Sequence, residues 1–153
     1  MERSLKFFQH DPTSQPLQTS QPKSNVFFMK THKTGSTTLQ NILERYADQN
    51  DLHIGLSLSP NDPRFRYSSG DYFRKQFVRA GTSPINMILH HMRFNYIEVK
   101  GLMPSDTVFI TILREPFSLF QSVFSYLHWN CKSFMRVKNN QEGFATWIEN
   151  PLR

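Results

Sequence analysis

Residue types that bind phosphate groups are concentrated in residues 30–38, whose sequence is KTHKTGSTT. Lys33 offers a positive charge, Gly35 lets the backbone approach a ligand closely, and hydroxyl side chains follow it. A loop that opens a helix also directs backbone N–H groups and the positive end of the helix dipole toward one point. The segment therefore predicts an anion-binding loop. An ordinary loop with a Ser/Thr helix cap explains the same residues equally well.

A second candidate phosphate contact lies further along the chain. Arg114 follows the most strongly predicted strand, and Ser122 lies eight residues later in a helical pattern. Ligands of open α/β sheets bind at the carboxyl ends of the strands. We therefore expect Arg114 and Ser122 to lie near the first loop and to hold a second phosphate. The alternative for Arg114 is a surface ion pair with Glu115.

Hydrophobic periodicity places these segments between regular elements. Short apolar runs predict strands, and apolar residues at i, i+3, i+4 and i+7 predict helices. The alternation of the two predicts an α/β fold with a parallel sheet flanked by helices on both faces. The predicted strands are 26–30, 52–58, 85–89 and 107–113, and the predicted helices are 37–50, 71–80, 96–103, 116–128 and 142–149.

Composition separates the chain into two regions. Residues 1–24 are rich in Pro, Gln and Ser, which predicts a disordered stem or linker, and residues 25–153 contain the predicted folded region. The formal net charge is +6, which favours anionic partners. Because the basic residues are scattered rather than grouped in runs, nucleic-acid binding is the least favoured interpretation.

Several other classes of site lack their sequence signals. The loop does not have the GxxxxGK[ST] spacing of a Walker A motif, which argues against a P-loop kinase, and no GxGxxG motif is present. The six histidines and the single cysteine are not at metal-ligand spacings, so we expect no metal site. No apolar run reaches the roughly 18 residues of a membrane helix.

Three motifs, in order, resemble those of a known family. KTHKTGSTTLQNIL resembles the 5′-phosphosulfate loop of the Golgi carbohydrate sulfotransferases, and ILREPFSLFQSVFSY resembles their 3′-phosphate motif. HHMRFN, together with LMPSDTVFITILREP, is similar to the galactose-3-O-sulfotransferase branch, which includes galactosylceramide sulfotransferase. The resemblance covers residues 25–126. It implies a P-loop-like sulfotransferase fold, of which residues 25–153 are the N-terminal part, incomplete at the C-terminus.

The resemblance also implies a reaction and roles for residues. The enzyme would move a sulfuryl group from 3′-phosphoadenylyl sulfate, its co-substrate, to the 3-hydroxyl of galactose, with no metal. His91 would be the base on the acceptor hydroxyl, with His90 as the second candidate, and Lys33 would stabilise the leaving oxygen. The residues implied in donor binding are Lys33, Thr34, Gly35, Ser36, Thr37, Thr38, Arg114 and Ser122.

The partners and the compartment follow from the same resemblance. The acceptor would be a galactose-terminated glycolipid or glycoprotein glycan, with no nucleic-acid partner. The location would be the lumenal side of the Golgi membrane, which this chain would reach only through an anchor that its sequence lacks. The alternative function is that of a truncated, non-catalytic relative that binds a nucleotide.

Overall fold

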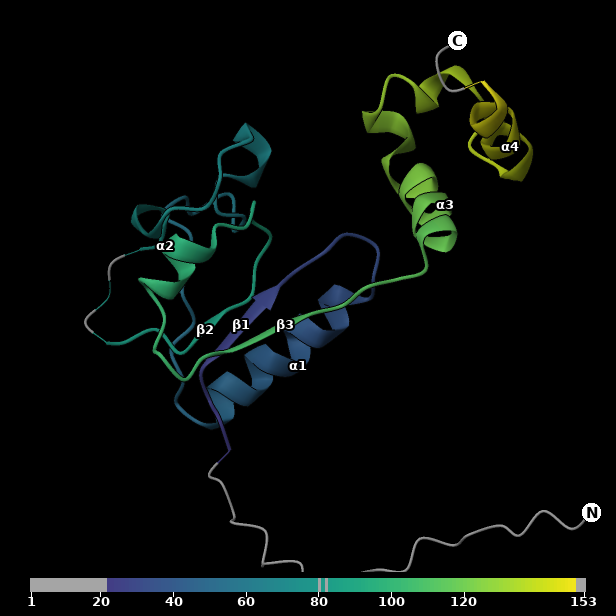
Figure 1. Cartoon of the computed structure of the whole chain (residues 1–153). Helices are drawn as coiled ribbons and strands as arrows, with labels where there is room; N and C mark the ends of the chain where they lie inside the picture. The colour runs from purple at the N-terminus through teal and green to yellow at the C-terminus, as the bar shows by residue number, and fades with distance from the viewer. Residues whose placement is uncertain (1–21, 80, 82, 151–153) are drawn as a thin grey trace, which may run out of the picture.

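The computed structural model describes residues 22–79, 81 and 83–150 (Figure 1). The predicted stem at residues 1–24 therefore lies almost wholly outside the described residues. Its last three residues have no regular structure. The strands and helices are β1 (Val26–Met29), α1 (Ser36–Gln49), β2 (Met87–Ile88), α2 (Tyr96–Lys100), β3 (Val108–Thr111), α3 (Pro116–Leu127) and α4 (Gln141–Glu149).

The three strands form a parallel sheet in the order β2-β1-β3. The central strand β1 pairs Phe27 with Ile88 on one side and with Phe109 on the other. Parallel strands require crossover connections, and α1 begins the crossover from β1 to β2 while α2 lies in the crossover from β2 to β3. The prediction of an α/β fold with a parallel sheet is confirmed.

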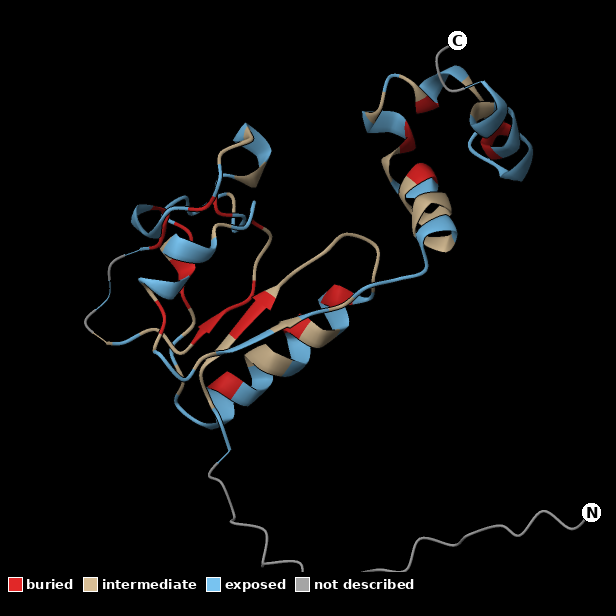
Figure 2. Cartoon of the chain, in the orientation of Figure 1, coloured by how far each residue is buried: buried red, intermediate tan, exposed pale blue. Residues whose placement is uncertain are grey.

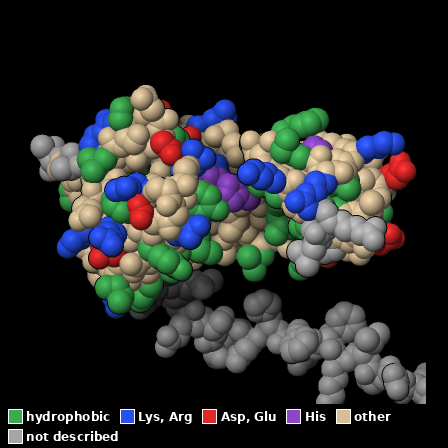
Figure 3. Space-filling model, turned by 90° about the horizontal axis from the view of Figure 1, so that it is seen from above, with side chains coloured by type: hydrophobic (Ala, Val, Ile, Leu, Met, Phe, Trp, Pro, Cys, Tyr) green, Lys and Arg blue, Asp and Glu red, His purple; other side chains and the backbone are tan. Residues whose placement is uncertain are grey.

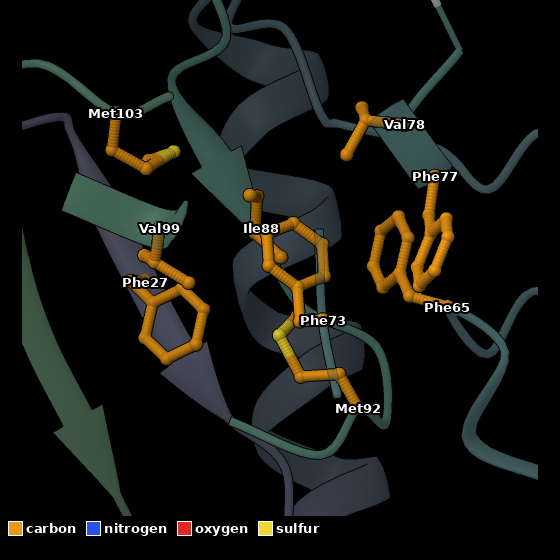
Figure 4. Packing of buried hydrophobic residues seen from close by; sticks show 9 residues of the cluster. All are labelled: Phe27, Phe65, Phe73, Phe77, Val78, Ile88, Met92, Val99 and Met103. Carbon is orange, nitrogen blue, oxygen red and sulfur yellow. The ribbon is translucent and has the colours of Figure 1, made fainter. Parts of the chain in front are cut away.

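Two hydrophobic clusters cover the two faces of the sheet (Figure 2). Consecutive residues of a strand point to opposite faces, so Phe28 packs with Ala47 of α1 while Phe27 packs on the other side. On that second side the buried residues come from α2 and from an irregular segment between α1 and β2 (Figure 4). They include Phe65, Phe73 and Val99.

The helices that follow β3 have a hydrophobic core of their own. Phe124 of α3, Phe144 of α4 and Phe134 between them are buried together. The ring centroids of Phe124 lie 5.0 Å from Phe134 and 5.2 Å from Phe144. Figure 1 places this group of helices, the C-terminal helices, beside the sheet and joined to it by the extended chain after β3.

Two predicted elements are wrong. Residues 52–58 form no strand and make only the isolated bridges Ile54–Met87 and Ser57–Val78. Residues 71–79 contain the 3-10 helix Lys75–Phe77 and the isolated bridge Tyr72–Arg93 in place of the predicted α-helix. The backbone of both segments bonds to neighbouring chain instead: the N–H of Phe73 donates to Arg93 O at 2.7 Å. Tertiary contacts here override the local pattern.

The remaining elements agree with their predictions apart from their ends. Helix α1 lies within one residue of its predicted span at each end, and α4 starts one residue earlier than predicted. Helix α2 is shorter than predicted because Gly101 ends it, and β2 keeps only two residues of the predicted strand 85–89. The side chain of Glu115 caps α3 by accepting the N–H groups of Phe117 and Ser118 at 2.8 and 2.7 Å.

We predict that Phe28→Ala lowers the free energy of unfolding by about 3–5 kcal/mol, because Phe28 is fully buried between the sheet and α1. Urea denaturation followed by circular dichroism measures this loss. The matched control is Phe109→Ala, since Phe109 is 43% exposed on β3 and should cost less than half as much. Equal losses would contradict this packing arrangement.

Candidate functional site

The loop between β1 and α1 has an unusual backbone that opens toward solvent. Lys33 and Gly35 have φ angles of 57° and 78°, in the left-handed region. A residue with a Cβ pays roughly 1–2 kcal/mol for this conformation, whereas glycine adopts it freely. The loop therefore turns sharply immediately before the first helical residue, Ser36, and α1 begins with its N-terminus at the site.

Hydrogen bonds from Thr31 and its neighbours hold the loop in this shape. Thr31 Oγ1 donates to the carbonyl of Ile112 at 2.8 Å, which ties the loop to the chain just after β3. Ser36 Oγ donates to the Thr31 carbonyl at 2.6 Å. Thr34 Oγ1 lies 2.8 Å from Thr31 Oγ1 and 3.3 Å from the Thr31 carbonyl. The loop is thus fixed before any ligand binds.

A cavity of about 280 Å³ lies against this loop. Its walls come from the loop, the first turn of α1, the segment after β2, and α3 of the C-terminal helices. Figure 3 shows histidine at the surface where the sheet-containing part meets the C-terminal helices, with basic side chains next to it. The lining residues are Thr31, His32, Lys33, Gly35, Ser36, Thr37, His91 and Tyr126.

Five of the residues expected at the site, from Lys33 to His91, therefore line one cavity. Thr34 supports the loop through Thr31, and Thr38 is exposed on the first turn of α1. Arg114 reaches the loop because its Nη1 donates to the carbonyl of Lys33 at 3.0 Å. Ser122 lies half-buried on α3 and is not among the residues that line the cavity.

The ammonium group of Lys33 lies over an aromatic ring. Its Nζ is 4.1 Å from the centroid of the Tyr126 ring, a cation–π contact between the loop and α3. Tyr126 of α3 and Arg114, in the chain between β3 and α3, thus both contact Lys33 of the loop. The positive charge of Lys33 is thus held next to Tyr126, in the lining of the cavity.

The hydrogen bonding of His91 defines its tautomer. His91 Nδ1 lies 3.0 Å from the carbonyl oxygen of Lys30, and a carbonyl can only accept, so Nδ1 carries the proton. In the neutral ring Nε2 is then free to accept a proton. Burial first, and then electrostatic repulsion from His32, Lys30 and Arg64, lowers the pKa of His91 to about 4, against the opposing effect of the hydrogen bond to the Lys30 carbonyl. His91 is therefore an unprotonated base at neutral pH.

His32 stacks on His91, with ring centroids 4.1 Å apart and planes at 11°. The ring of Tyr67 lies 5.3 Å from His32 and 5.9 Å from His91. Burial and then the charge of Arg64 lower the pKa of His32. The stack limits rotation of the His91 ring and so reinforces the orientation that the Lys30 carbonyl imposes.

His90, the second candidate base, has other partners. Its Nδ1 lies 3.1 Å from Gln40 Nε2, and Gln40 also donates to Glu44 Oε1 at 2.6 Å and accepts from Lys30 Nζ. Burial lowers the pKa of both His90 and Lys30. This network lies beside the cavity rather than lining it, which favours His91 as the base.

Sequence reasoning missed several residues of the site. Thr31 and His32 belong to the phosphate-loop motif itself, and their polar side chains next to Lys33 were the available signal. Tyr67 and Tyr126 carried no such signal, because only the packing of distant segments brings them to the histidines and to Lys33. Within residues 22–79, 81 and 83–150, no group of three or more His, Cys, Asp or Glu could hold a metal ion.

None of the helices among the described residues is both long enough and apolar enough to cross a bilayer.

Comparison with known proteins identifies relatives of this chain. The galactose-3-O-sulfotransferase 3 of Mus musculus is 42% identical over 127 residues, which cover 81% of this chain and 29% of the relative. The galactosylceramide sulfotransferase of Homo sapiens is 44% identical over 109 residues, or 69% of this chain and 25% of the relative. The human galactose-3-O-sulfotransferase 4 is 34% identical over 148 residues, or 92% of this chain and 29% of the relative.

The chain thus spans 29% of the length of the first of these relatives. No solved structure matches it. A model of the family described as galactose-3-O-sulfotransferase matches residues 6–153, which is nearly the whole sequence. With the loop, the cavity and the three motifs in agreement, the chain belongs to the galactose-3-O-sulfotransferase family.

Proposed function

We propose that this chain carries the donor-binding loop and the general base of a sulfotransferase. The enzyme moves a sulfuryl group from 3′-phosphoadenylyl sulfate to the 3-hydroxyl of galactose on a glycolipid or a glycoprotein glycan. One observation carries the proposal: the cavity that contains Lys33 and the N-terminus of α1 also contains His91, with Nε2 free to accept a proton. Residues 25–153 form the N-terminal part of a P-loop-like sulfotransferase domain in this proposal.

The loop suits the phosphosulfate end of the donor. The amide groups at the N-terminus of α1, the charge of Lys33 and the hydroxyl of Thr37 are directed at the same cavity. Arg114 contacts the loop through the Lys33 carbonyl, and its guanidinium is proposed to bind the 3′-phosphate of the same nucleotide. Ser122, on the helix that Arg114 precedes, is proposed as its partner.

The transfer is an in-line displacement in which atoms and charge balance. The acceptor hydroxyl oxygen forms a bond to sulfur, and the bond between sulfur and the bridging phosphate oxygen breaks. His91 Nε2 takes the hydroxyl proton, and adenosine 3′,5′-bisphosphate leaves with the bridging oxygen. Lys33 stabilises the negative charge that develops on that oxygen. The reaction as proposed takes place on the lumenal side of the Golgi membrane.

We predict that the chain binds adenosine 3′,5′-bisphosphate, and that Lys33→Ala and Arg114→Ala each weaken binding at least tenfold, because each removes a charge-assisted contact. Isothermal titration calorimetry measures the affinities, with 5′-AMP as the ligand that lacks the 3′-phosphate. Lys132→Ala is the control, since Lys132 is exposed on the C-terminal helices. Equal binding of 5′-AMP would contradict a 3′-phosphate site.

We predict that His91→Asn lowers kcat with a galactoside acceptor by about 10²–10⁴-fold, because it removes the proton acceptor. Nucleotide affinity should change little, since Lys33 and the α1 N-terminus remain. A radiolabelled-donor assay gives the rate, and His53→Asn, at an exposed position after α1, is the matched control. Binding without turnover in the unsubstituted chain would instead support the non-catalytic alternative.

We predict that kcat/KM for the donor, which reports the free enzyme, stays level as the pH falls below 6.5 and declines as it approaches about 4. The direction follows from His91: its pKa is lowered to about 4, so the base remains unprotonated through this range. The measurement is a pH–rate profile in which circular dichroism verifies the fold at each pH. A half-maximal rate near pH 6.5 would mean that an unshifted histidine is the base.

A further inference from the structure

A second cavity, of about 420 Å³, lies in the irregular segment between α1 and β2. Its volume falls within the roughly 300–1,000 Å³ of small-molecule sites. One wall is fixed by the antiparallel bridge between Ser57 and Val78 and by the N–H of Leu58, which donates to the Phe77 carbonyl at 2.9 Å. The opposite wall is the chain from Asp62 to Ser69.

The walls of this cavity combine hydroxyl groups, paired charges and an aromatic surface. Ser57 is buried, and its Oγ accepts the N–H of Ser59 at 3.2 Å. Among the described residues the hydroxyl proton of Ser57 has no acceptor, so it is available to a ligand. Phe77 supplies an apolar surface. Such a mixture of donors, acceptors and an apolar surface suits a sugar, which has hydroxyls at its edge and C–H groups on its faces.

The charges of the cavity are balanced. Arg64 Nε lies 2.7 Å from Asp62 Oδ1, and Arg66 Nε lies 3.0 Å from Asp71 Oδ2. Each guanidinium therefore has a carboxylate partner, which offsets part of the positive charge that the cavity presents to an anion. Asp62 already accepts from the backbone N–H, Nε and Nη2 of Arg64 and from Ser68 Oγ, so a hydroxyl group of a neutral ligand would share these oxygens with Arg64 and Ser68. The arrangement favours a neutral sugar over an acidic one.

Residues 64–67, which form part of the cavity wall, also contact His91, the proposed base. The N–H of Phe65 donates to the His91 carbonyl at 3.2 Å, and the ring of Tyr67 lies 5.9 Å from that of His91. Arg64, one residue before Phe65, lines the cavity, and its charge contributes to the lowered pKa of His91. The same short segment therefore lines the cavity through Arg64 and Arg66 and contacts His91 through Phe65 and Tyr67.

Arg66, between Phe65 and Tyr67, has a φ of 54°, in the left-handed region, where a residue with a Cβ is strained unless its surroundings stabilise it. Its ion pair with Asp71 and the position of its guanidinium 5.2 Å from the Phe77 ring centroid provide that support. The wall is thus shaped in advance of binding, which lowers the entropy cost of holding a ligand.

We propose that this cavity binds a neutral sugar of the acceptor, with Asp62, Arg64 and the hydroxyl of Ser57 as the groups that recognise it. The inference rests on the proposed function, because it assigns to the same enzyme the site that presents a galactose to His91. In this proposal, a neutral galactoside is preferred to an acidic sugar because Asp62 and Arg64 balance each other's charge.

The test is an NMR titration of the ¹⁵N-labelled chain with methyl β-D-galactopyranoside and, separately, with D-galacturonate, which carries a carboxylate at C6. We expect the galactoside to shift the amide signals of residues 57–59, 62 and 64–69 and to bind at least fivefold more tightly than galacturonate. Shifts confined to other residues, or tighter binding of galacturonate, would overturn the proposal.

Two variants sharpen the test. Asp62→Asn should weaken galactoside binding about tenfold, because a charge-assisted hydrogen bond is lost. Ser68→Trp, at an exposed position of the 3-10 helix Tyr67–Ser69, should block the cavity with little effect on the fold. Asp48→Asn, exposed on α1, is the control and should leave binding unchanged. Unchanged binding in the first two variants would place the sugar elsewhere.

A parallel titration with adenosine 3′,5′-bisphosphate separates the two proposals. Nucleotide shifts at residues 31–37 without galactoside shifts at the cavity would reject the acceptor site alone. Absence of nucleotide shifts would reject the proposed function, and the inference that depends on it.

Discussion

The parallel pairing of β1 with both β2 and β3 is the constraint on which the candidate site depends. Because all three strands run the same way, their carboxyl ends meet at one edge of the sheet. The loop with Lys33 follows β1, His91 follows β2 and Arg114 follows β3. The hydrogen bond from Thr31 to the Ile112 carbonyl then holds two of these three connections together at that edge.

The histidines of the site are controlled by burial and by positive charge. The Lys30 carbonyl accepts from Nδ1 of His91, and the stacked His32 and nearby Arg64 oppose protonation of its ring. A base kept neutral in this way accepts a proton without first having to lose one. The charge of Lys33, held over the Tyr126 ring, lies in the same cavity. The site thus places a neutral base and a cation within one enclosure.

Part of the site could be recognised from its motifs, and part could not. The loop from Lys33 to Thr37 and His91 follow strands whose apolar runs are visible in the sequence, so their meeting at one edge was predictable. Arg114 bonds to the loop without lining the cavity, and Ser122, in the same motif, does not line the cavity either. The cavity around Asp62 and Arg64 lies between two segments, residues 52–58 and 71–79, where a strand and a helix were wrongly expected.

The sequence by itself determined the α/β class, the positions of β1, α1, β3 and α3, and the family, because buried strands and amphipathic helices leave local patterns and the motifs are contiguous. Only the tertiary structure decided which face Phe65, Phe73 and Phe77 cover, and that Tyr67 and Tyr126 reach the histidines and Lys33. The physical reason is that irregular segments satisfy their backbone hydrogen bonds with distant neighbours, as Phe73 does with Arg93, and such pairings have no local signature.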